Sequence, residues 1–185
     1  MRRTRLALTV PLAGLAWSAW RAHSHDVSEG EERVFRTFNG APDVLAPFLW
    51  PVMQMGSLAA VYVVAAEQYR REGPTEAIAF AATGTAVWSG IKLIKPVIGR
   101  GRPADHLERV RVRGHRQSGL GYPSGHAAVS LTIALSASMN ARERRLAVLG
   151  AAVTAASRMY VGAHLPLDVV GGAAAGWLVG AVAAR

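Results

Sequence analysis

The sequence contains no cysteine, so it forms no disulfide and no thiolate metal site, and cysteine usage says nothing about its redox compartment. Acidic residues are scarce too: 12 Asp and Glu stand against 21 Lys and Arg, a formal net charge of +9 at pH 7. Charged residues make up 18% of the 185 residues and apolar residues 51%, a balance that leans toward membrane proteins. The length predicts a single domain over residues 1–185.

Six apolar segments are separated by polar or charged residues, at about 6–20, 44–66, 77–94, 127–140, 146–161 and 165–184. A membrane-spanning helix needs about 20 apolar residues. The second and sixth segments reach that length, and the third nearly does. The first, fourth and fifth are short enough to be buried helices of a soluble all-α bundle, so segment length alone leaves both classes open.

The distribution of arginines favours the membrane. If the N-terminal Arg2, Arg3 and Arg5 are cytoplasmic, six crossings place residues 67–75, residues 140–145 and Arg185 on the same side. Those short connections are rich in arginine, as the positive-inside rule requires. The loop 95–125 breaks the rule, because it is strongly basic on the outer side. We therefore expect a six-transmembrane-helix bundle whose basic outer loop binds an anion.

The N-terminal region permits two interpretations. Arginines followed by the apolar residues 6–20 resemble a secretory signal, but Trp20, Arg21 and His23 occupy the place of a small-residue cleavage site. We favour an uncleaved first helix, followed by an interfacial segment that extends to residue 43. In the last apolar segment, Gly172, Gly176 and Gly180 form a smooth ridge. This ridge packs within the monomer or in a dimer seam, so the oligomeric state stays open.

The first chemistry-bearing motif is Lys95-Pro-Val-Ile-Gly-Arg-Gly-Arg102-Pro103, at the exit of the third apolar segment. For Lys95 alone, a cation that reaches the headgroups from a helix end is a sufficient explanation. The prolines and glycines of the motif let Arg102 fold back toward Lys95. A guanidinium binds phosphate through two parallel hydrogen bonds, so both cations are candidate phosphate ligands.

The second motif, Pro123-Ser124-Gly125-His126, opens the fourth apolar segment. Ser124 is a favourable N-cap, which is a structural explanation of its own. The same geometry leaves free amides at a helix start, where they bind anions. Gly125 permits close approach of the backbone to an oxyanion, and the His126 ring can face that anion.

The third motif contains Arg158, His164 and Asp168. An acid in the first turn of a helix also stabilises the helix dipole, which is the simpler reason for Asp168. The carboxylate is close enough in sequence to accept a proton from one nitrogen of His164, which leaves the other lone pair free to attack. Three cations surround these groups and would repel a metal ion, so we predict no metal site and no cofactor. The arginines form no basic stripe with aromatic platforms, which argues against nucleic acid.

The order and spacing of these motifs, K-x6-R-P, P-S-G-H and S-R-x5-H-x3-D, resemble the type 2 phosphatidic acid phosphatase (PAP2) family over about residues 44–184. The resemblance implies an all-α core similar to that of vanadium haloperoxidases and metal-independent hydrolysis of a lipid phosphate at an outer face of the bacterial plasma membrane. It implies that His164 is the nucleophile, Asp168 its orienting acid and His126 the general acid. The implied phosphate ligands are Lys95, Arg102, Ser124, Gly125 and Arg158.

The substrate expected from this resemblance is a phosphorylated lipid. The arginines of 109–113 suggest more negative charge than one phosphate carries, which favours a polyprenyl diphosphate, although they can also face anionic lipid. Phosphatidic acid and phosphatidylglycerol phosphate are alternatives, and a non-catalytic lipid-phosphate binding or transport protein is the alternative from another class. Residues expected around the site or in the substrate loop are Arg100, Arg109, Arg111, Arg113, Tyr122 and Pro123.

Overall fold

The computed structural model describes residues 2–184, with side chains from residue 8 onward, and this part of the chain is helical without strands. The all-α prediction is therefore confirmed. In chain order the elements are α1 (Arg2–His23), α2 (Glu29–Asn39), the 3-10 helix η1 (Asp43–Leu45), α3 (Ala46–Met53), the 3-10 helix η2 (Gln54–Gly56), α4 (Leu58–Glu72), α5 (Pro74–Ile98), α6 (Pro103–His106), α7 (Gly125–Ser136), α8 (Ala141–Tyr160) and α9 (Pro166–Ala183).

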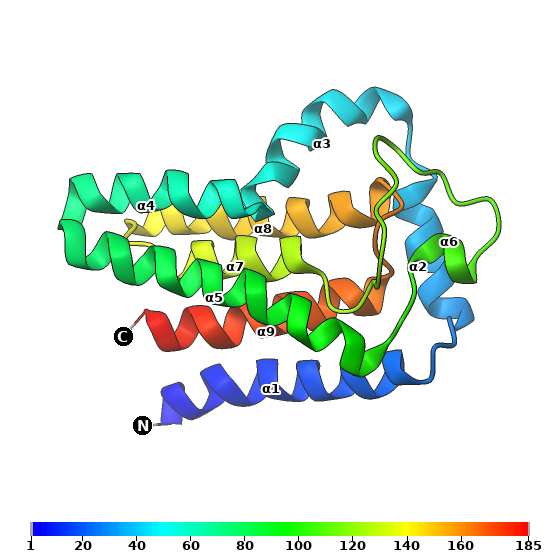
Figure 1. The fold of residues 1–185 in the computed structure, drawn as a ribbon, viewed down its shortest axis with the longest axis horizontal. Coiled ribbons are helices and arrows are strands. Elements are labelled where there is room, and N and C mark those ends of the chain that lie inside the picture. Colours follow the sequence, from blue (N-terminus) through cyan, green and yellow to red (C-terminus); the bar gives the residue numbers. More distant parts are fainter. Residues whose placement is uncertain (1, 185) are drawn as a thin grey trace.

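The long helices run side by side as a bundle, with α7 packed against α4, α5, α8 and α9, and with α1 covering α9 (Figure 1). The α4–α5 and α7–α8 connections lie at the end of the bundle where the chain termini also lie. The loops between α6 and α7 and between α8 and α9 lie at the opposite end, together with α2 and α6. All three motifs are thus gathered at one end of the bundle.

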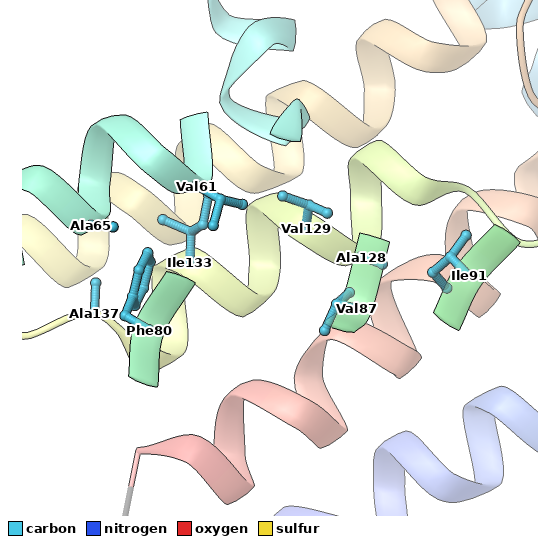
Figure 2. Close-up of a cluster of buried hydrophobic side chains, with 9 residues drawn as sticks. All are labelled: Val61, Ala65, Phe80, Val87, Ile91, Ala128, Val129, Ile133 and Ala137. Atoms are coloured by element: carbon cyan, nitrogen blue, oxygen red, sulfur yellow. The ribbon is translucent and has the colours of Figure 1, made fainter. Parts of the chain in front are cut away.

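The apolar core lies where α4, α5 and α7 meet (Figure 2). Its side chains are small or β-branched, apart from one phenylalanine, so the helices approach closely. The members are Val61, Ala65, Phe80, Val87, Ile91, Ala128, Val129, Ile133 and Ala137. Burial of these groups fixes α7, and α7 carries His126 at its first turn.

The predicted glycine ridge packs within the chain, against α7. A Cβ added to Gly172 would lie 2.2 Å from the Ser124 carbonyl oxygen, and one added to Gly176 would lie 2.2 Å from the Ala128 carbonyl oxygen. No side chain fits at such distances, so α9 approaches α7 backbone to backbone. This contact places the start of α9, with Asp168, beside the start of α7.

The predicted continuous segment 44–66 is divided in the structure, where the helical stretches Asp43–Gly56 and Leu58–Glu72 are bent by 67°. Ser57 has an extended backbone and caps α4, because its side chain accepts a hydrogen bond from the Ala60 amide at 3.2 Å. A Cβ on Gly56 would lie 2.4 Å from the His126 carbonyl oxygen. The break therefore packs directly on the first turn of α7, and the apolar segment is two helical stretches rather than one.

Two described stretches, Pro74–His106 and Pro166–Ala183, are long and apolar enough to cross a membrane, and the bent pair would make a third. The predicted six crossings are thus not confirmed by length and composition. The physical reasons are local: α7 has 12 residues, and α8 carries three arginines, Arg142, Arg144 and Arg145, in its first turns.

Arginines gather at the end of the bundle away from the motifs. Arg71 of α4 donates to Glu143 of α8 at 2.9 Å, and Arg144 donates to the Leu135 carbonyl at the end of α7 at 2.6 Å. The predicted same-side connections 67–75 and 140–145 therefore lie together. The side chains of Arg2, Arg3, Arg5 and Arg185, which entered the same prediction, lie outside the described residues.

Candidate active site

A cavity of about 380 Å³ lies at the end of the bundle that carries the motifs. It is bounded by α3, the loop after α6, the first turn of α7 and the end of α8. Its lining includes Trp50, Met53, Arg102, Val112, Arg113, His115, Arg116, Gln117, His126, Arg158 and Val161. One wall is therefore basic and another is apolar.

His164 and Asp168 are brought together by the connection between α8 and α9. Gly162 adopts a left-handed φ of 76°, which reverses the chain after α8, and a Cβ there would lie 2.6 Å from the Arg111 carbonyl oxygen. Asp168, in the first turn of α9, accepts a hydrogen bond from the Leu165 amide at 2.9 Å. The same Oδ2 lies 3.4 Å from His164 Nδ1. Nδ1 makes no hydrogen bond at this distance, so the geometry places the acid beside one nitrogen of the imidazole without closing the contact.

The other imidazole nitrogen, Nε2, lies 3.4 Å from Arg102 Nη1. A guanidinium has hydrogens to donate and no lone pair to offer, so the group that faces it must be an acceptor. This assigns the lone pair to Nε2 and the proton to Nδ1, beside Asp168. His164 is 3% exposed and lies behind the part of the cavity wall formed by Arg102 and Ala163.

Burial lowers the pKa of His164 well below its ordinary value, and the nearby Arg158, Lys95 and Arg102 lower it further. Each of these causes penalises the imidazolium. At neutral pH the ring is therefore uncharged, which is the form that has a free lone pair. Burial and the cationic surroundings thus favour a nucleophilic histidine.

Arg158 is 4% exposed and lines the cavity. Its Nη1 donates to the Met53 sulfur at 3.1 Å, and its Nε has no hydrogen-bond partner. Among the described residues no carboxylate pairs with it. A buried cation without an anionic partner is costly, and an anion in the cavity would satisfy it.

Arg102 connects the two loops that enclose the cavity. It donates to the Gly119 carbonyl at 3.0 Å, the Ser118 carbonyl at 3.2 Å and the Ala163 carbonyl at 2.7 Å. These contacts hold the guanidinium at the cavity wall, with its Nη1 beside His164 Nε2. The structure therefore brings Arg102, Arg158, His126 and His164 together, as the spacing of the motifs predicts.

Lys95 lies in the last turn of α5, where its motif indicates, and its ammonium faces the backbone. Its ammonium donates to the carbonyls of Leu120, Gly121 and Pro123 at 2.9, 2.7 and 3.0 Å. Three contacts use all three protons of the group. Lys95 thus holds the chain that leads into Ser124, and its contribution to an anion in the cavity is its charge rather than a free donor.

The second motif forms the start of α7. Ser124 is fully buried, donates its amide to the Asp168 carbonyl at 2.8 Å and caps the helix through the Ala127 amide. A Cβ on Gly125 would make an ordinary contact of 3.6 Å with Ile91, so packing does not require a glycine there. His126 lines the cavity, and its ring forms no hydrogen bond with another described residue. Its ring is free to serve a bound molecule.

The loop arginines are not equivalent. Arg113 lines the cavity, but its donors go to Asp43 and to the carbonyls of Asn39, Ala41 and Tyr160. Arg109 and Arg111 do not line the cavity. Arg116 also lines this wall, although the sequence did not single it out. Arg116 follows the alternating arginines of 109–113 in a loop without regular secondary structure. In such a loop no helical or strand periodicity indicates which residues face the cavity.

Three further residues predicted near the site contact other parts of the protein and do not line the cavity. Tyr122 is buried, and its hydroxyl lies 3.0 Å from the Ser18 hydroxyl of α1. Pro123 accepts from Lys95. Arg100 is fully buried and binds Glu31 of α2, which the sequence did not single out. Glu31 belongs to an acid-rich helix start that is typical of a solvated surface, so the sequence contains no local sign of its burial.

The described residues form a helical bundle with exposed apolar side chains, and a His–Asp pair lies at the end of the bundle that holds the cavity. The cavity is lined by four arginines, of which Arg158 is buried without a carboxylate partner in the described part of the chain, and this arrangement suits an anion. Residues 75–185 match the model of the PAP2 superfamily, and the chain belongs to that superfamily. The matched segment begins at α5 and contains all three motifs.

Curated relatives are similar over part of their length. A lipid A 4'-phosphatase of Bacteroides thetaiotaomicron is 36% identical over 46% of this chain and 43% of that protein. An undecaprenyl-diphosphatase of Sulfolobus acidocaldarius is 33% identical over 46% of this chain and 41% of that protein. The matches thus cover less than half the length of these relatives.

Two crystal structures share the fold. Aquifex aeolicus LpxE superposes with a TM-score of 0.73 at 24% identity, over 82% of this chain and 92% of that chain. The first transmembrane PAP2-type phosphatidylglycerolphosphate phosphatase from Bacillus subtilis superposes with a TM-score of 0.71 at 19% identity, over 91% of both chains. The apolar helices and this fold identify a membrane protein of the superfamily.

Proposed function

We propose that this protein is a metal-independent lipid phosphatase that acts through a phosphohistidine intermediate. The observation that carries the proposal is the buried Arg158, which lines the cavity beside His126 and Arg102 and has no carboxylate partner among the described residues. A phosphoryl group in the cavity supplies the missing negative charge. The neutral His164 beneath it supplies the nucleophile.

The reaction has two displacements. His164 Nε2 attacks phosphorus while the bond from phosphorus to the leaving oxygen breaks, and His126 gives that oxygen a proton. Burial, Arg158 and Arg102 lower the pKa of His126 to about 3, so His126 takes up this proton together with the phosphate, whose negative charge favours the imidazolium. Water then attacks the phosphohistidine, gives a proton back to His126, and releases phosphate and free His164. Asp168 holds the Nδ1 proton and stabilises the positive charge that develops on the imidazole. Arg102 and Arg158 stabilise the charge on the equatorial phosphoryl oxygens.

The substrate class we propose is a lipid whose phosphate lies at the membrane surface. Trp50, Met53, Val112 and Val161 form an apolar wall beside the cations, which suits the part of a lipid next to its headgroup. The printed names of the relatives include phosphatases of lipid A and of undecaprenyl diphosphate. A polyprenyl diphosphate remains our preferred substrate, with phosphatidic acid and phosphatidylglycerol phosphate as alternatives.

Arg116 gives this preference its support. It lines the cavity together with His115, whereas Arg113 is held by backbone carbonyls and Asp43. A second phosphate beyond the reacting one would meet Arg116 in this wall. A non-catalytic lipid-phosphate carrier would need the cations but not the His164–Asp168 pair, so turnover separates the two functions.

We expect purified protein in detergent to release phosphate from at least one of three lipids: undecaprenyl diphosphate, phosphatidic acid or phosphatidylglycerol phosphate. Activity should be unchanged in excess EDTA, because arginines rather than a metal neutralise the phosphoryl charge. Vanadate should inhibit it competitively, since vanadate adopts the five-coordinate geometry of the transition state. Phosphate release with and without EDTA measures this. Loss of activity in EDTA, with recovery on addition of a divalent ion, would contradict the proposal.

We also propose that the cavity faces the extracytoplasmic side. The reason is that the arginine-rich connections near Arg71 and Arg144 lie at the opposite end of the bundle. A thiol introduced as Val110→Cys should react with an impermeant maleimide in intact cells, whereas one introduced as Ala141→Cys should react only after permeabilisation. The protein has no native cysteine, so each variant has a single labelling site. The reverse pattern would refute the orientation.

A further inference from the structure

Arg100 is a buried arginine that lies between Lys95 and Arg102, at one of the six undefined positions of the K-x6-R-P motif. Its side chain is fully buried, and its guanidinium binds Glu31 through two contacts, Nη2 to Oε2 at 2.7 Å and Nη1 to Oε1 at 2.9 Å. This is a two-point, charge-assisted pair with good geometry. Glu31 is 8% exposed and lies in α2, which precedes the segment matched by the family model.

The same guanidinium reaches the reacting groups. Arg100 Nη1 lies 3.4 Å from Asp168 Oδ1, while the other oxygen of Asp168 lies 3.4 Å from His164 Nδ1. A continuous chain of charged and polar groups therefore runs from Glu31 through Arg100 and Asp168 to His164. No solvent-exposed residue interrupts it.

Glu31 also fixes the helix that carries Asp168. Its Oε1 accepts a hydrogen bond from the Leu167 amide at 3.0 Å, and Asp168 Oδ2 accepts one from the Leu165 amide at 2.9 Å. Both amides belong to the start of α9, where no partner within the helix is available. The Glu31 carboxylate of α2 thus makes two contacts near Asp168. One is with the Leu167 amide, next to Asp168 in the chain, and the other is with Arg100, which also contacts the Asp168 side chain.

The distances indicate how the Arg100 guanidinium is shared between the two carboxylates. Arg100 is closer to Glu31 than to Asp168, by 2.7 and 2.9 Å against 3.4 Å. Without the Glu31 carboxylate, the guanidinium would be free to pair fully with Asp168. That pairing would compete with the Nδ1 proton of His164 for the Asp168 carboxylate. A strongly held Arg100 leaves Asp168 available to orient the imidazole.

We propose that Glu31 is a positioning residue for the reaction: acting through Arg100, it holds Asp168 in the orientation that fixes the His164 tautomer. The inference rests on the proposed phosphatase function. It makes α2 part of the active site, although α2 lies outside the family-matched segment and its acidic start reads as surface.

The test is Glu31→Gln, with Glu32→Gln as the matched control. Glu32 is the next residue of the same helix, but it is partly exposed and pairs with Arg36. We expect Glu31→Gln to lower kcat by about 10- to 100-fold, the usual effect of losing an outer partner of a site residue, with KM within about twofold of wild type. Glu32→Gln should keep wild-type kcat.

A double-mutant cycle distinguishes positioning from a general loss of structure. If Glu31 acts through Asp168, then Glu31→Gln should cost nothing further in an Asp168→Asn protein. Full kcat in Glu31→Gln, or an equal loss in both backgrounds, would overturn the proposal. Wild-type inactivity on every lipid phosphate would instead refute the proposed function, and a second measurement then decides the role of Glu31.

That measurement is ¹⁵N NMR of histidine-labelled protein, with the His164 signals assigned from His164→Ala. Wild type should show a protonated Nδ1 and an unprotonated Nε2, and Glu31→Gln should shift or mix the two tautomers. Unchanged His164 signals in a folded Glu31→Gln protein would overturn the proposal without reference to activity. If Glu31→Gln does not fold, the same signals are recorded for Arg100→Lys, which keeps the charge but has no planar fork. Unchanged His164 signals in Arg100→Lys would likewise overturn the proposal.

Discussion

His164→Ala is expected to lower kcat on a lipid phosphate by on the order of 10⁵- to 10⁶-fold, the scale seen when the nucleophile of a hydrolase triad is removed. The alanine leaves no group beneath the cavity that can carry the phosphoryl group. Binding should persist, because Arg102 and Arg158 still line the cavity. Steady-state phosphate release and vanadate binding measure the two effects separately.

Asp168→Asn belongs to the same experiment, since it keeps the size of the side chain while the carboxylate that accepts the Nδ1 proton is lost. We expect a loss of roughly 10⁴-fold, comparable to that of other oriented-histidine enzymes. His23→Ala is the control, because His23 is exposed at the end of α1. If His164→Ala retained more than a few per cent of wild-type kcat, another residue would have to be the nucleophile.

His126→Ala is expected to give a loss that depends on the leaving group. With a lipid phosphate, whose leaving oxygen needs a proton, kcat should fall by about 10²- to 10⁴-fold, the usual contribution of general acid catalysis. With an activated aryl phosphate the first step needs no proton, so the loss should be much smaller. The His126 ring lines the cavity and forms no hydrogen bond with another described residue, which suits this role.

The measurement is kcat/KM for both substrate types in wild type and in His126→Ala, since this ratio reports the first displacement. His115→Ala serves as the control for removing an imidazole from the cavity wall. It should not discriminate between the two leaving groups. Equal losses of kcat/KM on both substrates in His126→Ala would exclude His126 as the general acid.

Much of the fold could be predicted from the apolar segments of the sequence. The segments at 77–94, 146–161 and 165–184 correspond to α5, α8 and α9, because each is a continuous run of residues that favour burial. The bend at Gly56 was missed, since a glycine inside an apolar run is compatible with a straight helix. What decides it is the backbone of His126, 70 residues away in sequence, and no local pattern records that contact.

The site was predictable to the extent that its residues lie in short motifs with a chemical reason for their order. The proximity of His164 to Asp168 follows from their spacing on either side of a helix start, and the placement of Arg102 from the glycines before it. The three carbonyls that Lys95 binds could not be predicted, because a cation at a helix end gives no sign of the backbone it will meet. Glu31 was missed because its burial depends on α2 docking against α9.

The central claim is that His164 carries the phosphoryl group, and trapping that intermediate tests it most directly. Wild-type protein is mixed with a ³²P-labelled lipid phosphate and quenched in alkali within the first turnover, because phosphohistidine survives alkali and is lost in acid. We predict an acid-labile label on the peptide that contains His164, and none in His164→Ala. Turnover without a labelled protein at any quench time, or a label that survives acid, would contradict the account.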